Sequence, residues 1–202
     1  LGLLRNLLLR PMMQSMDIKL GTLEFSPALS NGELLATPVR AALQALANSD
    51  MVGVAAIDGA LSDTAAFCAA YHVTESAAAN CVILEAKQGA ERAYAACVVL
   101  AHTRADVNGL IKKTLQVRKV SFASMELAVE ATEMEYGAIT PIGLPTDWPI
   151  FIDRAVAESN YVIIGSGVRA SKLAVTGAFL SALPNVRVLD DLGLDKSVYG
   201  KS

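Results

Sequence analysis

Two apolar runs, NCVILEA at residues 80–86 and YAACVVLA at residues 94–101, decide the fold that this sequence predicts. The polar stretch at residues 87–92 between them is typical of a hairpin turn. Both runs are nearly continuous in apolar character instead of alternating with polar residues, which indicates strands that are covered on both faces. We therefore expect a β-hairpin with other elements packed on each side of it.

Outward from this hairpin, short apolar runs alternate with segments of helical periodicity. Further strands are expected at residues 22–25, 51–57, 117–122, 150–152, 161–165 and 171–175. Helices are expected at residues 37–48, 64–71, 106–115, 124–133 and 176–184, with Thr37, Asp63, Asp106 and Ser124 as capping residues and Thr176 beginning the last helix. Because strands and helices alternate while two strand pairs look like hairpins, the fold class is α/β in the α+β sense, a mixed sheet with flanking helices.

The chain of 202 residues has no linker or repeat, which predicts a single domain spanning residues 16–188. Residues 1–15 are apolar but interrupted by two arginines and a proline, and they are too short to span a bilayer. We expect them to be an N-terminal extension, or added residues ahead of the natural start. The polar residues 189–202 are expected to form a loosely held tail.

The net charge of −3 limits the kind of partner that the chain can bind. A protein that holds nucleic acid by neutralising many phosphates is usually basic, so a DNA partner is not expected and any RNA contact must be local. One small basic cluster consists of Lys112, Lys113, Arg118 and Lys119. No segment has the length of a membrane span, so no membrane partner is expected either.

Three cysteines, Cys68, Cys81 and Cys97, show neither a CxxC spacing nor a histidine at metal-ligand spacing. We interpret them as reduced, mostly buried residues of a cytoplasmic protein. A catalytic cysteine would need a base, and the sequence places neither His72 nor His102 beside a cysteine. No metal or cofactor is predicted.

A glycine motif, GSGVRA at residues 165–170, has the G-x-G-x-x-A form of a dinucleotide-binding turn, with Asp190 and Asp191 roughly 20 residues further on. However, residues 171–202 are too few to complete a nucleotide-binding sheet. A tight turn between two strands is the better interpretation, and nicotinamide binding remains the alternative.

A second glycine motif is the loop GAITP, from Gly137 to Pro141. A glycine permits close backbone approach and positive φ, and the proline fixes the far end of the loop. Such a loop can direct backbone N–H groups at a bound oxygen, although an ordinary rigid turn would have the same pattern.

Several segments, in this order, resemble the YbaK/prolyl-tRNA-synthetase-associated editing domain family. They are FAS at 122–124 before an acidic helix, GAITPIGLP at 137–145, PIFID at 149–153, IIGSGVR at 163–169 and KL at 172–173. The resemblance runs from about residue 38 to residue 183 and is carried mainly by the part from residue 117 onward.

The resemblance implies a mixed, curved β-sheet with flanking helices and a metal-free, cofactor-free deacylase. Members of the family cut the ester between a wrong amino acid and the 3′ end of tRNA, in several cases tRNA for proline. The partner would then be the acceptor end of an aminoacyl-tRNA. The G-x-x-x-P loop, here Gly137 to Pro141, would lie against the aminoacyl group.

One departure concerns a lysine that the family usually has in a K-T-L-like stretch. Aligning His72–Val73 with the family's Gly–Val places Asn80 at that lysine. Asparagine can donate a hydrogen bond but brings no charge. The chain would then use another cation, hydrolyse poorly or prefer a different substrate.

The candidate catalytic residues are therefore Asn80, Gly137 and Thr140. The candidate substrate-binding residues are Ile139, Pro141, Ser121, Gly165, Gly167, Arg169 and Lys172, the last two as contacts to the phosphate backbone.

Two functional hypotheses follow. The first is a free-standing editing hydrolase for mischarged tRNA, and the second is a non-catalytic relative that binds tRNA, an aminoacyl group or a protein. A weak homodimer or a synthetase partner is compatible with either. Both hypotheses require that the stretch between Gly137 and Pro141 wall a cavity with Asn80 at its mouth.

Overall fold

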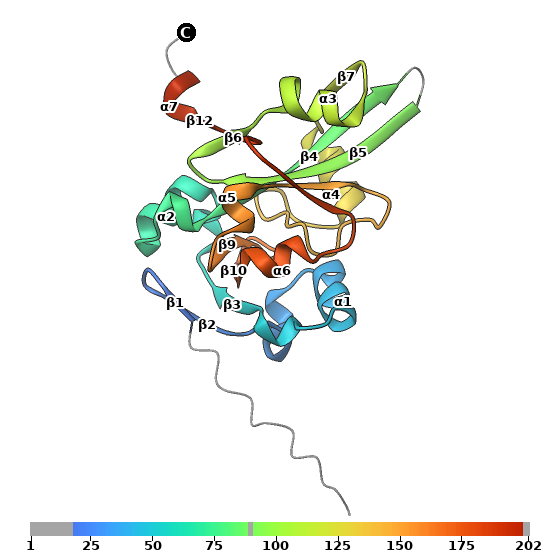
Figure 1. Ribbon diagram of the computed structural model, residues 1–202. Helices are drawn as coiled ribbons and strands as arrows, with labels where there is room; N and C mark the ends of the chain where they lie inside the picture. The colour runs from blue at the N-terminus through green and yellow to red at the C-terminus, as the bar shows by residue number, and fades with distance from the viewer. Residues whose placement is uncertain (1–17, 89–90, 200–202) are drawn as a thin grey trace, which may run out of the picture.

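The described part of the chain comprises residues 18–88 and 91–199 of a computed structural model (Figure 1). The predicted N-terminal extension at residues 1–15 lies outside the described residues. Within the two described ranges, no helix combines the length and the apolar character that crossing a membrane would require.

The predicted hairpin is confirmed as β4 (Ala79–Gln88) and β5 (Glu91–Leu100), which pair antiparallel along their whole length. Alternate side chains of β5 enter different cores. Ala96 and Val98 belong to one apolar cluster, whereas Cys97 belongs to another on the opposite face. The unbroken apolar run therefore reflects a strand that is covered on both faces, as expected.

The hairpin lies in the middle of a mixed five-stranded sheet. The strand order is β11 (Val186–Leu189), β8 (Ile150–Asp153), β5, β4 and β7 (Lys119–Phe122). β8 runs parallel to both β5 and β11, whereas β4 is antiparallel to β5 and to β7. The prediction of a mixed sheet is confirmed, and the parallel pairing is possible because a long crossover separates β5 from β8.

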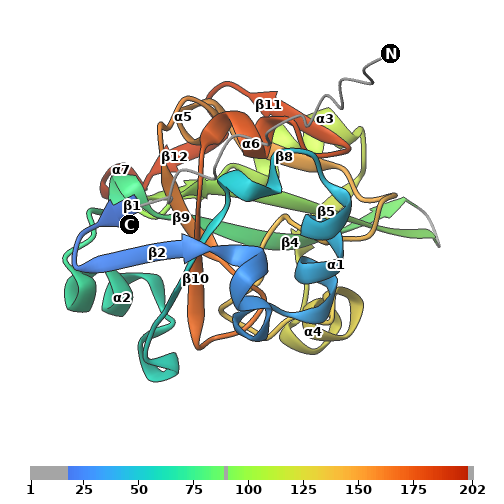
Figure 2. The same ribbon diagram turned by 90° about the horizontal axis from the view of Figure 1, so that it is seen from below.

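A second five-stranded sheet is antiparallel throughout. Its order is β1 (Ile18–Leu20), β2 (Leu23–Pro27), β3 (Gly53–Ala56), β10 (Ser171–Val175) and β9 (Val162–Gly165). An isolated β-bridge between Ala78 and Ile163 links it to the first sheet. In Figure 2, β10 runs across the direction of β4 and β5, so the two sheets curl around one apolar core that takes residues from both.

The helices are short and flank the sheets. The α-helices are α1 (Thr37–Ala45), α2 (Thr64–Tyr71), α3 (Lys112–Leu115), α4 (Met125–Thr132), α5 (Arg154–Ala157), α6 (Gly177–Ser181) and α7 (Lys196–Tyr199). The 3₁₀ turns are η1 (Ala28–Leu34), η2 (Ser49–Met51), η3 (Gly59–Leu61) and η4 (Glu75–Ala77), and a π-helical turn, η5 (Val107–Ile111), precedes α3. A small strand pair, β6 (Thr103–Ala105) with β12 (Gly193–Asp195), completes the fold.

Three predicted capping residues are confirmed, because the side chains of Asp63, Asp106 and Ser124 each accept hydrogen bonds from the first backbone N–H groups of their helices. The prediction for Thr37 is wrong. The helix begins at Thr37 itself, the N-cap position belongs to Ala36, and no side chain caps the helix. Proline in the first turn is enough to start it, since that N–H would have no helical partner.

The prediction of a loosely held tail is also wrong for its described part. Leu192 is fully buried, and its carbonyl accepts a hydrogen bond of 2.8 Å from the N–H of Asp106. Asp153 accepts a further bond of 2.7 Å from the N–H of Gly193, where β12 begins. A single apolar residue and a few backbone bonds thus anchor a segment whose composition is mostly polar.

The caps give a direct test of local stability. Asp106→Ala removes the acceptor for two backbone N–H groups, of Gly109 and Leu110, at 2.9 Å each. We expect this change to lower the free energy of unfolding by about 1 kcal/mol or somewhat more. Thr37→Ala should stay within about 0.5 kcal/mol of wild type, because its side chain is exposed and caps nothing. Urea denaturation of both variants measures the difference, and an equal loss in the two would contradict the assignment.

Candidate functional site

A cavity of about 450 Å³ opens where the two sheets meet. Its walls come from the start of α2, from β4, from the end of β7, from residues 136–139 and from the facing ends of β9 and β10. Five of the residues singled out in the sequence line it, namely Asn80, Gly137, Ile139, Gly165 and Lys172. The fold therefore brings together positions that lie more than 90 residues apart in the sequence.

The two glycine motifs form one piece of structure. GSGVRA is the connection between the antiparallel strands β9 and β10, so the interpretation as a tight turn is correct and no dinucleotide-binding helix follows it. Gly167 donates to the carbonyl of Ala138 at 2.8 Å and accepts from the N–H of Glu135 at 2.8 Å. A Cβ atom on Gly165 would come within 2.1 Å of the Ala138 oxygen, so only glycine permits the loop to lie so close.

The loop from Gly137 presents backbone donors beside the cavity. Gly137 has a φ of 85°, in the region that favours glycine. The N–H groups of Ala138 and Thr140 are used inside the loop, by the Glu135 carbonyl and the Met134 sulfur. Among the hydrogen bonds of the described residues, the N–H groups of Gly137 and Ile139 have no protein acceptor, and both residues line the cavity. They remain available to a bound oxygen atom.

Asn80 lies on β4 and lines the same cavity as that loop. Its Oδ1 accepts a hydrogen bond of 2.6 Å from the hydroxyl of Thr64, in the first turn of α2. This bond orients the amide, so that the NH₂ group is the part left for a ligand. The oxygen and nitrogen of the amide are assigned from this network.

Lys172 lies in the wall of the cavity and is only 6% exposed. Its Nζ donates to the carbonyl of Ser62 at 3.1 Å and lies 5.3 Å from the centre of the Phe67 ring. Burial lowers the pKa of this ammonium, while the nearby Cys68 and Asp63 act in the opposite direction. The expectation that Lys172 meets the phosphate backbone at the surface therefore does not fit its position.

The remaining predicted residues do not line the cavity. Thr140 is fully buried, and its hydroxyl has no hydrogen-bond partner among the described residues. Pro141 is also buried, and Gly167 packs against Ala36 behind the loop. Arg169 is exposed and donates to the carbonyl of Gly59 at 3.1 and 3.2 Å. Ser121 lies in β7 opposite Glu85. A substrate in the cavity would not touch these side chains.

Other residues that were not among the candidate site residues also line the cavity and carry chemistry. Asp63 and Glu75 bring carboxylates and Lys196 brings a second ammonium, so both signs of charge are present. Phe122 and Tyr136 stand at the cavity with 59% and 57% of their surface exposed. Their positions, two residues before the helix cap Ser124 and directly before Gly137, were the available signal, but the exposure of an aromatic residue cannot be recognised from sequence.

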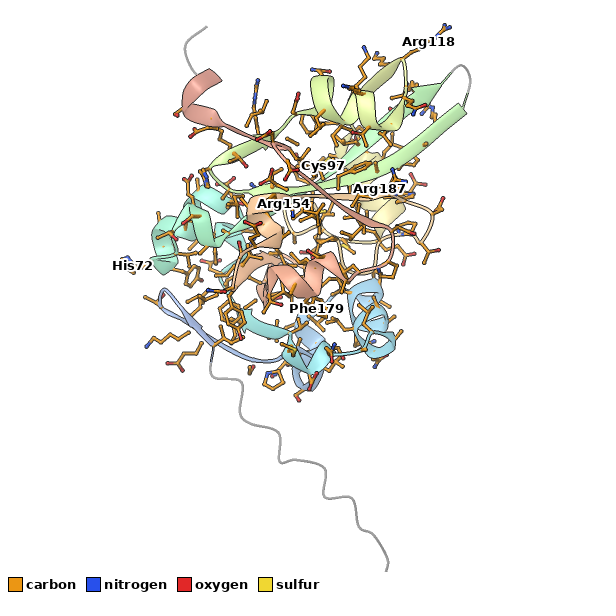
Figure 3. The ribbon with its side chains drawn as sticks, in the orientation of Figure 1. His72, Cys97, Arg118, Arg154, Phe179 and Arg187 are labelled. Carbon is orange, nitrogen blue, oxygen red and sulfur yellow. The ribbon has the colours of Figure 1, made fainter. Side chains whose placement is uncertain are left out.

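The cysteines are unsuited to nucleophilic chemistry. Cys81 lines the cavity, but burial raises the pKa of its thiol far above the ordinary value, and burial raises that of Cys97 to about 12. Both thiols are therefore protonated at neutral pH. Figure 3 shows Cys97 inside the molecule and His72 pointing outward at the surface, so this histidine does not activate that cysteine. All three cysteines are free, as predicted.

Solved structures share this fold at low sequence identity. One is a hypothetical protein, APE2540, with 22% identity and a TM-score of 0.59, covering 66% of this chain and 85% of that one. Another is a candidate trans-editing enzyme for prolyl-tRNA synthetase, with 18% identity and a TM-score of 0.65, covering 77% and 94%. A proposed signal transduction protein from Marinobacter aquaeolei VT8 matches at 18% identity and a TM-score of 0.54, covering 81% of this chain and 32% of that one.

A comparison with curated proteins finds no significant match. A family model, however, does match, and the predicted resemblance is confirmed by it. The model describes the aminoacyl-tRNA editing domain and matches residues 58–182, which include every element that lines the cavity except α7. This match covers more than half of the sequence, and the chain therefore belongs to the aminoacyl-tRNA editing domain family.

Proposed function

We propose that this chain hydrolyses the ester bond between an amino acid and the 3′ end of a mischarged tRNA, as an editing deacylase. The observation that carries the proposal is the cavity, which is lined by both the Gly137 loop and Asn80. Its volume of about 450 Å³ lies in the range of small-molecule sites and suits an amino acid joined to a ribose. Membership of the family supports an editing function.

Hydrolysis of an aminoacyl ester requires little catalytic assistance from the site. An aminoacyl ester is already activated, so holding a water molecule and stabilising the negative charge on the carbonyl oxygen provide much of the rate. The free N–H groups of Gly137 and Ile139 are suited to the second task. The three free cysteines agree with a cytoplasmic location, where tRNA is charged and edited.

The rim of the cavity suggests how the RNA end is held. Phe122 and Tyr136 offer exposed aromatic rings on which the terminal bases of a single-stranded acceptor end can stack. Stacking needs no phosphate neutralisation, so it agrees with the net charge of −3. We propose that these two rings, together with the cavity, bind the last nucleotides of the tRNA.

The second candidate function is binding without catalysis. Two observations favour it: Asn80 stands where the family resemblance implies a lysine, and the described residues that line the cavity include no histidine to act as a general base. Such a protein would retain a mischarged tRNA without releasing the amino acid.

A deacylation assay over a panel of misacylated tRNAs, with tRNA for proline among them, separates the two. We expect wild type to release the amino acid from at least one of them, and Gly137→Ala to lower kcat at least about tenfold, because a φ of 85° disfavours alanine by roughly 1–2 kcal/mol and the loop must shift. Gly143→Ala is the control away from the cavity, since Gly143 has the same φ of 85° and does not line the cavity, although a Cβ there would also come within 2.6 Å of the Pro38 carbonyl oxygen. It should reduce stability without reducing turnover per folded molecule.

Binding without turnover on every tRNA of the panel would establish the second candidate instead. In that case Asn80→Lys becomes the informative variant. A gain of turnover in Asn80→Lys would show that the uncharged amide at position 80 accounts for the missing activity.

The stacking proposal is tested by binding. Phe122→Ala and Tyr136→Ala should each weaken the affinity for an acceptor-stem minihelix about tenfold, corresponding to roughly 1–3 kcal/mol per stacked base. Phe122→Trp should retain it. Met51→Ala removes another exposed apolar side chain, 46% exposed and outside this cavity, and should change nothing. If fluorescence anisotropy shows that all four variants bind the minihelix with the affinity of wild type, the stacking proposal is ruled out.

A further inference from the structure

The cavity wall contains an ammonium group whose charge no described side chain neutralises by an ion pair. Lys172 is 6% exposed, and none of the ion pairs of the described residues includes it. We propose that Lys172 is a catalytic residue, whose Nζ donates a hydrogen bond to the carbonyl oxygen of the aminoacyl ester as that oxygen becomes negatively charged. This assignment rests on the deacylase function proposed above and adds the group that supplies its positive charge.

The position of the ammonium relative to the Gly137 loop supports the assignment. Nζ lies 3.1 Å from the carbonyl oxygen of Ser62, and the hydroxyl of the same serine lies 3.6 Å from where a Cβ of Gly137 would be. Ser62 therefore lies between the ammonium and the loop, with its carbonyl on Lys172 and its hydroxyl beside Gly137. Lys172 also pairs with Gly165 across β9 and β10, and the loop packs on Gly165. The charge and the free loop N–H groups thus meet at one end of the cavity.

The hydrogen-bonding capacity of the group points the same way. A lysine ammonium has three N–H donors, and in the described structure it uses one, toward Ser62. The Phe67 ring, 5.3 Å away, stabilises the charge without consuming a donor. Donors therefore remain for an oxygen atom inside the cavity.

The free energy of burial makes a purely structural role a poor explanation. Removing an ammonium from water is unfavourable, and a single carbonyl and a ring compensate for it only in part. A methionine at this position would fill the same space without the penalty. The buried charge of Lys172 therefore lowers the stability of the folded chain, and residues that lower stability in this way are typical of functional sites.

A phosphate of the tRNA backbone is the less suitable ligand. Lys172 is enclosed by β9, β10 and the start of α2, so a backbone phosphate would have to enter the cavity to reach Nζ. The aminoacyl ester is the part of the substrate that the cavity is proposed to hold.

The reaction step balances as follows. The oxygen of a water molecule forms a bond to the ester carbon, and the carbonyl oxygen gains a negative charge that Lys172, still protonated, stabilises together with the loop N–H groups. The bond from that carbon to the ribose oxygen then breaks. One proton of the water ends on the ribose hydroxyl, and the other is released to solvent as the amino acid leaves as a carboxylate.

The test compares Lys172→Met and Lys172→Arg with wild type. Lys172→Met should lower kcat about 100-fold, as removal of one oxyanion donor does, with KM within about threefold. Its melting temperature should equal that of wild type or exceed it by roughly 2–4 °C, because the buried charge is gone. Lys172→Arg should keep kcat within about tenfold of wild type. Lys19→Met, an exposed lysine on β1, is the control and should leave every quantity unchanged.

The outcomes are distinct. Turnover in wild type with an unchanged kcat in Lys172→Met would overturn the assignment and leave the deacylase function standing. A lower melting temperature in Lys172→Met, with activity reduced in proportion to unfolding, would show a structural role and also overturn it. No turnover by wild type on any tRNA overturns the deacylase function and the assignment together.

The pH dependence provides a second readout. Burial lowers the pKa of Lys172, and the groups that face it from α2 and its cap, Cys68 and Asp63, oppose this shift; Glu75 and Lys196 also line the cavity. The wild-type kcat, corrected for uncatalysed hydrolysis, should therefore fall as the pH rises through a value below the ordinary lysine pKa of about 10.4. In Lys172→Arg this fall should be absent, because the guanidinium stays charged.

The same shift predicts how stability changes with pH. Since the pKa of Lys172 is lower in the folded than in the unfolded state, the unfolded state binds more protons between the two values. The free energy of unfolding of wild type should thus rise with pH relative to Lys172→Met across this window. Urea denaturation at pH values from about 7 to about 10 measures the difference, and a constant difference would contradict the lowered pKa of Lys172 in the folded protein.

Discussion

The contact between the Ala138 carbonyl and the glycines of the β9–β10 turn determines the shape of the site. Backbone lies directly on backbone here, and a Cβ on Gly165 would leave only 2.1 Å to the carbonyl oxygen. Gly167 fixes the approach by two hydrogen bonds of 2.8 Å, one accepted and one donated. These bonds engage the Ala138 carbonyl and the Glu135 N–H, and among the described residues the N–H groups of Gly137 and Ile139, which line the cavity, have no acceptor. The position of this cavity wall therefore depends on the absence of side chains at Gly165 and Gly167.

This contact also explains why the two glycine motifs occur in one chain. Taken separately, GSGVRA resembles a nucleotide-binding turn and GAITP resembles a rigid loop. In the folded chain the two motifs pack against each other, and the backbone of the GAITP loop lies directly on the backbone of the two glycines of GSGVRA. The residues of both motifs that face away from the cavity, Thr140 and Gly167 among them, serve this packing and not the ligand.

How much of this could be predicted from sequence depends on the range of the interactions involved. The hairpin at β4 and β5 and the caps at Asp63 and Asp106 were predictable, because local patterns and neighbouring N–H groups decide them. The burial of Lys172 was not, since it depends on Ser62 and Phe67, more than 100 positions away in the sequence. The same holds for Leu192, whose anchoring contact is with Asp106. Sequence indicates which residues can do chemistry, but packing over long separations decides which of them face the cavity.

An acidic chain that handles tRNA must obtain its affinity over a small area. Four exposed basic residues, Lys112, Lys113, Arg118 and Lys119, lie at α3 and at the start of β7, and Figure 3 shows Arg118 projecting from the molecule there. Lys119 and Phe122 begin and end the same strand, so roughly 10 Å separates this cluster from the aromatic rim. Under the proposed function, such a site would contact the ester and the terminal bases, so discrimination among tRNAs would come from the aminoacyl group or from a second protein that delivers the substrate.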